Sequence, residues 1–413
     1  MPSNDITILR ELAQRYAEIA ALPIQEEKRR LWSDHFSLKR TRVPIIAGFG
    51  MWNVWCREVF GDANMRCEDP FYRGYERDLR MRLFQYDNGD DSIQEPWLTI
   101  GVPQVWKQQG LWGVDESLTK LEGVADGSAG CYNPSVKTWD DVGKLRALKH
   151  ERDEEAGARI YDKLASAVGD IIEIDVQRSP VYTGFNGDIS TSIAKLRGLQ
   201  QLMVDMYESP DELRNLLAFM RDAILDNNQA AEDAGHFTLT SSHNQQMSYA
   251  NGLEPLRANS GPRKRGDIWG FFAAQEYALI SPEFHDEFLF QYQLPIMEKY
   301  AMTHYGCCED LGEKMGMLRQ LKNLRSIAVV PLADVRRCAE QIGGEYAMSW
   351  RPNPASMVCC GYDEGRVEKI VRKAMDDAGE NIIHINLKDV ETLEGDTTRM
   401  KRWVAKVREV VDR

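Results

Sequence analysis

Long apolar runs and dense positive charge are both missing from this 413-residue sequence. No segment reaches the roughly 20 apolar residues that a membrane-spanning helix needs. The first 32 residues alternate charged and apolar side chains at helical spacing, which predicts neither a signal peptide nor an anchor. The chain has 51 Lys and Arg against 64 Asp and Glu, a formal charge of −13. Phosphate binding needs clustered positive side chains, so we expect no nucleic-acid partner, and we expect a cytoplasmic location.

Several catalytic motifs are also absent. The sequence contains no G-x-S-x-G elbow, no H-E-x-x-H, no P-loop and no kinase-like set. These absences argue against serine acyl hydrolysis, phosphoryl transfer and metalloprotease chemistry. No G-x-G-x-x-G follows the first expected strand, so a dinucleotide-binding sheet has little support.

Short strand-like runs alternate with longer amphipathic stretches, which is the pattern of repeated β–α units. The expected strands lie at 42–50, 95–106, 170–177, 236–244, 267–274, 299–306, 324–332, 345–352 and 380–389. The clearest expected helices lie at 209–235, 281–301 and 363–380. This order predicts an α/β fold, a (β/α)₈ TIM barrel over residues 41–413 with a helical extension over residues 1–40. A doubly wound open sheet is the alternative.

Polar side chains follow several expected strands, where the active site of a barrel gathers. We interpret four of them as candidate proton donors or acceptors, namely Asp175, His243, Lys388 and Asp389. Candidate substrate contacts are Asn244, Trp350 and Arg351. Simpler interpretations stay open: a capping acid for Asp175, a core side chain for Trp350, and an ordinary salt bridge between Lys388 and Asp389.

The stretch "THYGCCED" at 303–310 places a histidine, two adjacent cysteines and two acids in eight positions. It could form a metal site, a redox pair or a sulfur-rich core turn. Zinc prefers thiolate, imidazole and carboxylate, and a catalytic zinc usually takes three protein ligands. We therefore predict zinc ligands at Cys307, Cys308 and Glu309, with Cys360 from the second cysteine pair. The spacing is not C-x₂-C, and buried free thiols are the alternative.

Three long segments resemble the uroporphyrinogen decarboxylase superfamily, in particular its corrinoid-linked methyltransferases. They are "SPEFHDEFLFQYQLPIMEKY", the stretch that runs from "THYGCCEDLGEKMGMLRQ" to "EYAMSWRPNPA", and "NIIHINLKDVETLEGDTTRMKRWV". The resemblance covers about residues 160–413 and implies a (β/α)₈ barrel.

Two departures from the family pattern narrow what the resemblance implies. The arginine-rich R-Q-A-G-R stretch of the decarboxylases is replaced by "IIAGFGMWNVWCRE". The His-x-Cys of the zinc-dependent thiol methyltransferases reads Tyr305-Gly306-Cys307, and the last strand, "HINLKDVE", has no cysteine.

What remains is the demethylating branch, which implies methyl transfer from a methoxylated or methylated-amine donor to a corrinoid protein. The chain has no D-x-H-x-x-G motif, so we expect the corrinoid on a partner. Zinc or a general acid would activate the leaving group. An aromatic wall that includes Trp52, with Tyr305 nearby, would suit a methoxyaromatic donor. The oligomeric state stays open, and a homodimer is compatible with the sequence.

Two other classes of function stay open. One is a metal-independent decarboxylase or other lyase of the uroporphyrinogen decarboxylase type, with a pocket dominated by Asp175, Arg351 and Lys388. The other is a barrel that binds a ligand without catalysis, against which the many polar strand ends speak.

Overall fold

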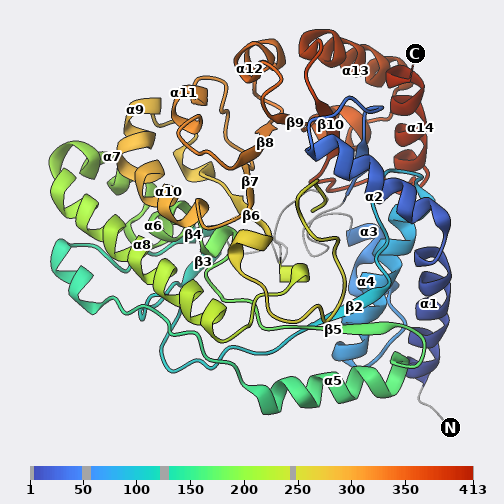
Figure 1. The fold of residues 1–413 in the computed structure, drawn as a ribbon, viewed down its shortest axis with the longest axis horizontal. Helices are drawn as coiled ribbons and strands as arrows, with labels where there is room; N and C mark the ends of the chain where they lie inside the picture. Colours follow the sequence, from blue (N-terminus) through green and yellow to red (C-terminus); the bar gives the residue numbers. More distant parts are fainter. Residues whose placement is uncertain (1–3, 49–56, 121–129, 242–247, 413) are drawn as a thin grey trace.

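A computed structural model of the chain describes residues 4–48, 57–120, 130–241 and 248–412. Its centre is a curled parallel sheet of six strands in the order β1-β10-β9-β8-β7-β6 (Figure 1). These strands are β1 (Ile45–Ala47), β6 (Trp269–Phe272), β7 (Met302–Tyr305), β8 (Leu324–Val329), β9 (Ala347–Trp350) and β10 (Ile383–Leu387). The first strand therefore pairs with the last, as in a barrel.

Two smaller strand pairs accompany this sheet. Strand β2 (Trp97–Gly101) pairs in parallel with β5 (Glu173–Gln177), and β3 (Leu118–Lys120) pairs antiparallel with β4 (Gly130–Tyr132). Within the described ranges, no hydrogen-bonded ladder joins β2 and β5 to the six-stranded sheet. The structure thus shows a half-barrel of parallel strands, and a closed TIM barrel is not shown.

Eight of the nine expected strands are confirmed, and the run at 236–244 is the exception. Its described part forms a 3₁₀ turn, η4 (Leu239–Ser241). Hydroxyl groups explain the difference, because Ser241 Oγ accepts from the backbone N–H of Thr238 at 3.0 Å and lies 3.2 Å from Thr238 Oγ1. Such local side-chain bonds compete with a strand ladder. The prediction of a strand at 236–241 was therefore wrong.

Helices flank the strands on the outside of the curled sheet (Figure 1). The amino-terminal part of the chain contains α1 (Asn4–Ala20), α2 (Pro23–Phe36), α3 (Arg57–Phe60), α4 (Pro70–Asp87), α5 (Glu154–Val168), α6 (Ser190–Arg197), α7 (Leu199–Glu208) and α8 (Pro210–Asp233). The carboxyl-terminal part contains α9 (Pro282–His285), α10 (Gln291–Met297), α11 (Met315–Leu318), α12 (Val335–Ile342), α13 (Glu364–Ala378) and α14 (Arg399–Val411). Short 3₁₀ turns are η1 (Asp62–Asn64), η2 (Trp139–Lys144), η3 (Gly184–Asn186), η5 (Arg265–Asp267) and η6 (Gln275–Tyr277), and π-helical turns are η7 (Asp286–Phe290) and η8 (Ala355–Cys359).

The three clearest helix predictions are confirmed, and their ends follow from the sequence. Helix α8 begins at Pro210, which suits a first turn, and is followed by Gly235 with φ +69°. Helix α13 begins after Asp363, whose carboxylate accepts from the backbone N–H of Arg366. The stretch 281–301 is helical as α9, η7 and α10, with a π-turn in the middle.

The chain buries two large apolar cores. The main core lies between the six-stranded sheet and its helices and includes Leu387, Trp403 and Leu217. A second core lies between β2, β5 and helices α1, α4 and α5, and it includes Leu9 and Leu164. The β2–β5 pair therefore packs with its own set of helices. The predicted division of the chain at residue 40 stays a prediction.

Helix α2 packs against the amino ends of the central strands. Its Trp32 and Phe36 share an apolar cluster with Trp269 at the start of β6. Its His35 Nε2 lies 2.8 Å from His384 Nδ1 on β10, and both rings are buried. This end of the sheet is therefore filled with aromatic side chains, and a ligand site has to lie at the opposite, carboxyl end.

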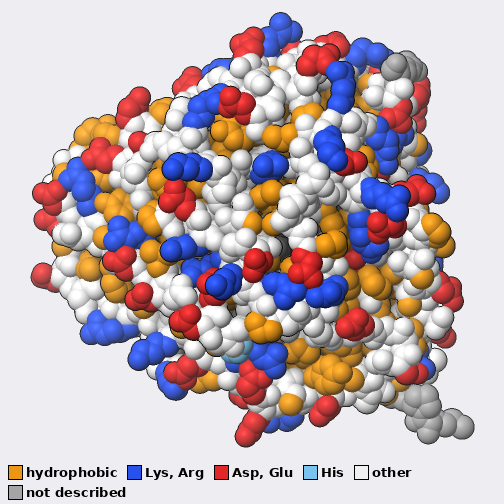
Figure 2. Space-filling model, viewed as in Figure 1, with side chains coloured by type: hydrophobic (Ala, Val, Ile, Leu, Met, Phe, Trp, Pro, Cys, Tyr) orange, Lys and Arg blue, Asp and Glu red, His pale blue; other side chains and the backbone are white. Residues whose placement is uncertain are grey.

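The surface is polar and of mixed charge. Figure 2 shows Lys and Arg interspersed with Asp and Glu over the face drawn there, with hydrophobic side chains between them. Among the described helices, none combines the length and the hydropathy that crossing a membrane requires.

We predict that stability decreases in mildly acidic solution because of buried histidines. Burial lowers the pKa of His35 to about 3 and lowers the pKa of His384 well below its ordinary value. In the unfolded chain these histidines have a pKa of about 6.5. Below that pH the unfolded state binds protons that the folded state does not bind, so the free energy of unfolding decreases. Between pH 7.5 and 5.5, each such histidine should lower the free energy of unfolding by about 1.4 kcal/mol.

Urea denaturation at the two pH values measures this effect. The His35→Gln, His384→Gln double variant removes both rings and should lose about 2.8 kcal/mol of that pH dependence. An unchanged pH dependence in the double variant would contradict the prediction.

Candidate active site

A cavity of about 1450 Å³ lies at the carboxyl edge of the six-stranded sheet. Its described walls include the ends of β1 and β10, the loop after β7, the turn η6 and helix α6. These elements contribute Gly48, Asn386, Lys388, Asp389, Cys307, Cys308, Gln275, Glu276, Thr191 and Lys195. Ligand pockets usually span about 300–1,000 Å³, so this cavity has room for more than one small molecule.

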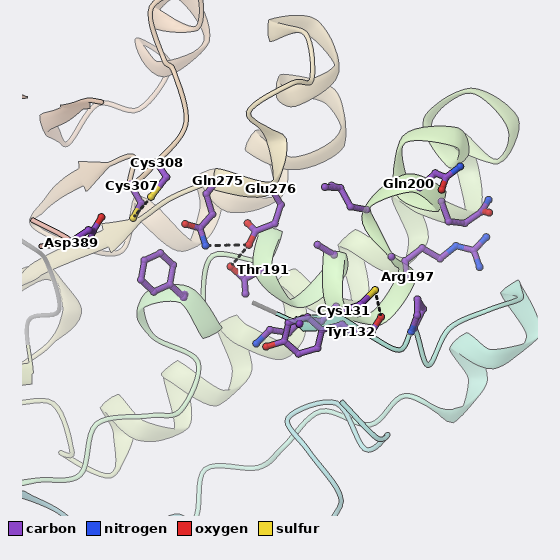
Figure 3. A pocket seen from close by; sticks show the side chains of 18 of the residues that line it. Cys131, Tyr132, Thr191, Arg197, Gln200, Gln275, Glu276, Cys307, Cys308 and Asp389 are labelled. Atoms are coloured by element: carbon purple, nitrogen blue, oxygen red, sulfur yellow. Dashed lines mark hydrogen bonds between the residues drawn. The ribbon is translucent and has the colours of Figure 1, made fainter. Parts of the chain in front are cut away.

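The cavity is elongated, and its ends differ in chemistry (Figure 3). Cys307, Cys308 and Asp389 lie on one side of the view, at the sheet. Gln275, Glu276 and Thr191 lie in the middle, and Tyr132, Arg197 and Gln200 lie on the other side. The adjacent thiols of Cys307 and Cys308 thus lie at the strand ends with Asp389, whereas Glu276 and Arg197 lie farther along the cavity.

The two cysteines after β7 lie side by side on the cavity wall. Cys307 Sγ and Cys308 Sγ are 3.5 Å apart, Cys307 is buried and Cys308 is exposed. The carboxylate of Glu309 accepts from the backbone N–H groups of both cysteines at 2.9 Å and from that of Ala274 at 2.6 Å. Glu309 therefore fixes the loop after β7 against the loop after β6.

A buried arginine is hydrogen-bonded to the same loop. Arg351, which follows β9, donates to the carbonyl oxygen of Cys307 and, at 3.0 Å, to His304 Nε2. His304 Nε2 also lies 3.0 Å from the carbonyl oxygen of Gly306, and His304 Nδ1 lies 3.0 Å from Ser326 Oγ. Burial, together with the nearby charge of Arg351, lowers the pKa of His304 well below its ordinary value, so the ring is neutral.

The surroundings of Cys308 favour its thiolate. The hydrogen bond from the Cys307 thiol lowers the pKa of Cys308 to about 7, and the Lys388 ammonium acts in the same direction. Lys388 Nζ lies 4.0 Å from Cys308 Sγ. The same thiol–thiol hydrogen bond, followed by burial, raises the pKa of Cys307. One sulfur of the pair is therefore a proton donor and the other is a nucleophile or soft ligand near neutral pH.

Lys388 and Asp389 form an ion pair at the end of β10. Asp389 has a left-handed backbone with φ +60°, a conformation that costs a residue with a Cβ atom free energy. In an extended strand the consecutive side chains of Lys388 and Asp389 would point to opposite faces. The left-handed turn at Asp389 instead lets them contact each other.

A carboxylate stands in the middle of the cavity. Glu276 accepts from Thr191 Oγ1 and Ser190 Oγ, each at 2.9 Å. Behind it lies the fully buried Asp188, whose pKa is raised well above its ordinary value by burial and by the charge of Glu276. Next to Asp188, Ile189 has a positive φ of +65°, which is unusual for a β-branched residue.

The predicted site residues divide into two groups. Cys307, Cys308, Lys388 and Asp389 all line the cavity. Tyr305, Trp350, Arg351 and Asp175 are not among its described lining residues. Tyr305 faces helix α10, where its hydroxyl donates to Gln293 at 2.7 Å, and Trp350 packs in the main core. Their predicted roles as substrate contacts stay predictions.

Asp175 lies away from the cavity lining, on β5. Its carboxylate accepts from Thr240 Oγ1 at 2.7 Å and from the backbone N–H of Asn259 at 2.9 Å. Both bonds hold the loops beside the β2–β5 pair together. Three other predicted residues, Trp52, His243 and Asn244, lie outside the described residues.

The four predicted zinc ligands do not come together in one set. Glu309 uses both carboxylate oxygens for backbone N–H groups, and Cys360 follows η8 and is not among the described lining residues. In the part of the chain that the structure describes, no group of three or more His, Cys, Asp or Glu side chains is arranged to hold a metal ion. Zinc binding stays a prediction.

Several lining residues were missed from the sequence. Phe185, Thr191 and Glu276 come from η3, α6 and η6, which are short elements between strands and give no strand-end signal. Asn386 could have been found, since strand alternation in "HINLKD" places it on the same face as Lys388.

Comparisons with known proteins add little to this description. No protein-family model matches the chain, and no curated protein does. Among solved structures, a methyltransferase from Methanosarcina mazei is 11% identical, with 92% of this chain and 97% of that one covered and a TM-score of 0.48. A likeness at this level carries no argument about chemistry, which has to come from the site.

We predict that Cys308 is alkylated with a pH midpoint near 7 and that Lys388 contributes to this value. Removal of the ammonium in Lys388→Met should move the midpoint to higher pH, because a nearby positive charge stabilises the thiolate. The rate of iodoacetamide labelling of the Cys308 peptide, followed by mass spectrometry from pH 5 to 10, measures the midpoint. Lys401→Met, on the exposed face of α14, is the matched control. Identical midpoints in Lys388→Met and the control would contradict the assignment.

Proposed function

We propose that this chain is a methyltransferase that takes a methyl group from a small methoxylated or methylated-amine donor and passes it to a corrinoid carried by a partner protein. One observation carries the proposal. A large cavity at the carboxyl edge of the parallel sheet brings the Lys388–Asp389 pair and the thiol of Cys308 together. The resemblance of residues 160–413 to corrinoid-linked methyltransferases supports it.

The difficult part of this reaction is the departure of the demethylated group. An alkoxide or phenoxide leaves poorly unless it is protonated or hydrogen-bonded. Lys388 has three N–H donors, and Asp389 holds its ammonium on the cavity wall. We assign Lys388 as the donor to the leaving oxygen and Asp389 as the residue that positions it. Glu276, in the middle of the cavity, would accept a hydrogen bond from a hydroxyl or ammonium group of the donor.

The size of the cavity fits a large second reactant. At about 1450 Å³ it exceeds the volume that a small donor fills. A corrinoid, when bound, supplies a cobalt nucleophile that accepts the methyl group. The residues of this chain bind the donor, orient its methyl group and hold a proton at Lys388 Nζ.

No step of this mechanism is assigned to zinc, because a catalytic zinc usually takes three protein ligands and, among the described residues, no three His, Cys, Asp or Glu side chains are arranged to hold a metal ion. The decarboxylase alternative has less support from the geometry. Of the three residues expected to dominate its pocket, only Lys388 is among the described lining residues. Asp175 accepts a hydrogen bond from Thr240, and Arg351 donates to the carbonyl oxygen of Cys307.

We predict methyl transfer to free cob(I)alamin from a methoxylated phenol or from trimethylamine. Formation of methylcobalamin, followed by its absorbance, measures the rate. Lys388→Met should lower that rate by about 10²–10⁴-fold, the usual range for loss of a general acid.

Lys401→Met should keep the parent rate, since Lys401 lies on the exposed surface of α14. A donor with a better leaving group should be affected less by Lys388→Met, because it needs less help from an acid. An equal loss with both donors would contradict the role of Lys388, and no transfer from any such donor would contradict the proposed function.

A further inference from the structure

Of the described cysteines, Cys307 and Cys308 are the pair whose sulfur atoms lie within hydrogen-bonding distance, at 3.5 Å. The second adjacent pair differs, since Cys359 is buried in the main core and Cys360 is exposed after η8. The arrangement of the first pair therefore comes from its loop and does not follow from adjacency in the sequence.

The loop holds both sulfur atoms on one side of the backbone. Consecutive side chains of an extended strand point in opposite directions, but here Gly306 has φ +104° and ends the strand. A Cβ atom at Gly306 would meet Leu311 Cδ1 at 2.7 Å and Ala328 Cβ at 2.9 Å. The backbone N–H groups of both cysteines are bound to Glu309, and the carbonyl of Cys307 is bound to Arg351. The pair is thus preorganised.

Access and charge distinguish the two sulfur atoms. Cys308 is exposed on the cavity wall and lies 4.0 Å from Lys388 Nζ, whereas Cys307 is buried behind it. A small oxidant that enters the cavity therefore reaches Cys308 first. Cys307 is placed to react second, as a resolving thiol.

We propose that Cys307 and Cys308 are a redox-active vicinal dithiol that a peroxide converts reversibly into a disulfide. The Cys308 thiolate attacks one oxygen of hydrogen peroxide, and the O–O bond breaks. Hydroxide departs, and Cys308 becomes a sulfenic acid. The Cys307 sulfur then attacks Cys308 Sγ, the S–O bond breaks, and water leaves. In total, two thiols and one peroxide give one disulfide and two waters, a two-electron oxidation of the protein.

Geometry makes this disulfide labile. Adjacent Cα atoms joined by a trans peptide are about 3.8 Å apart, which is less than the roughly 4.4–6.8 Å that most disulfides span. The bond would be strained, and strained disulfides are reduced easily. The pair therefore suits a reversible site and does not suit a permanent cross-link. Because it needs only the two thiols and an oxidant, this inference goes beyond the proposed methyl transfer and does not depend on it.

Mass spectrometry of the whole protein tests the proposal. Treatment of reduced protein with a slight excess of hydrogen peroxide should lower its intact mass by about 2 Da, with the link between residues 307 and 308. Dithiothreitol should restore the original mass. After treatment, iodoacetamide should label two cysteines fewer than in the untreated protein.

Two variants serve as matched controls. The Cys359→Ser, Cys360→Ser variant removes the other adjacent pair and should still lose about 2 Da. Cys307→Ser removes the resolving thiol, so Cys308 should gain oxygen as sulfenic or sulfinic acid. Gain of oxygen at Cys308 in the parent protein, or a mass loss that persists in Cys307→Ser, would overturn the proposal. Locating the disulfide by mass spectrometry in the parent protein requires no substitution, so this test remains valid even if a variant does not fold.

Discussion

The arrangement of the site depends on one carboxylate. Glu309 is fully buried and binds three backbone N–H groups, one from the loop after β6 and two from Cys307 and Cys308 after β7. A buried carboxylate is tolerated only when its oxygens are hydrogen-bonded, so the chain has to fold both loops around it. The loops after neighbouring strands are thereby fixed to each other, which holds the backbone of both cysteines in place.

Two cations set the electrostatics of this end of the sheet. Arg351 is buried under the cysteine loop and finds a carbonyl oxygen and a neutral imidazole as partners. Lys388 stands beside Cys308, with Asp389 as its counterion. Positive charge below and beside a thiol favours its ionised form. The amino end of the same sheet is filled by Trp32, Phe36 and neutral histidines, so reactivity is confined to the carboxyl end.

The sequence predicted the strands better than it predicted the site. Eight runs of β-branched and aromatic residues are strands, because burial on both faces of a parallel sheet leaves a continuous apolar signal. The run at 236–241 contains three hydroxyl side chains, which bond locally instead. The rule that active sites lie at strand ends selected Cys308, Lys388 and Asp389, which all line the cavity. It also selected Tyr305, which donates to Gln293 on α10, and Trp350, which packs in the main core, and their roles as substrate contacts stay predictions. The rule could not find Glu276, which η6 places in the cavity. Those positions depend on tertiary packing between elements that are far apart in the chain.

The strand order has a consequence for how the chain is made. Strand β1 pairs with β10, and helix α1 buries Leu9 against Leu164 from α5. On the ribosome, where about 5–20 residues are added each second, α1 would wait on the order of 10 s for its partners, and β1 would wait longer for the last strand. During that interval the part of α1 that packs against α5 and one edge of β1 have no native cover, although α4 can already pack against α1. Folding of the six-stranded sheet is therefore expected to finish only after β10 has been synthesised.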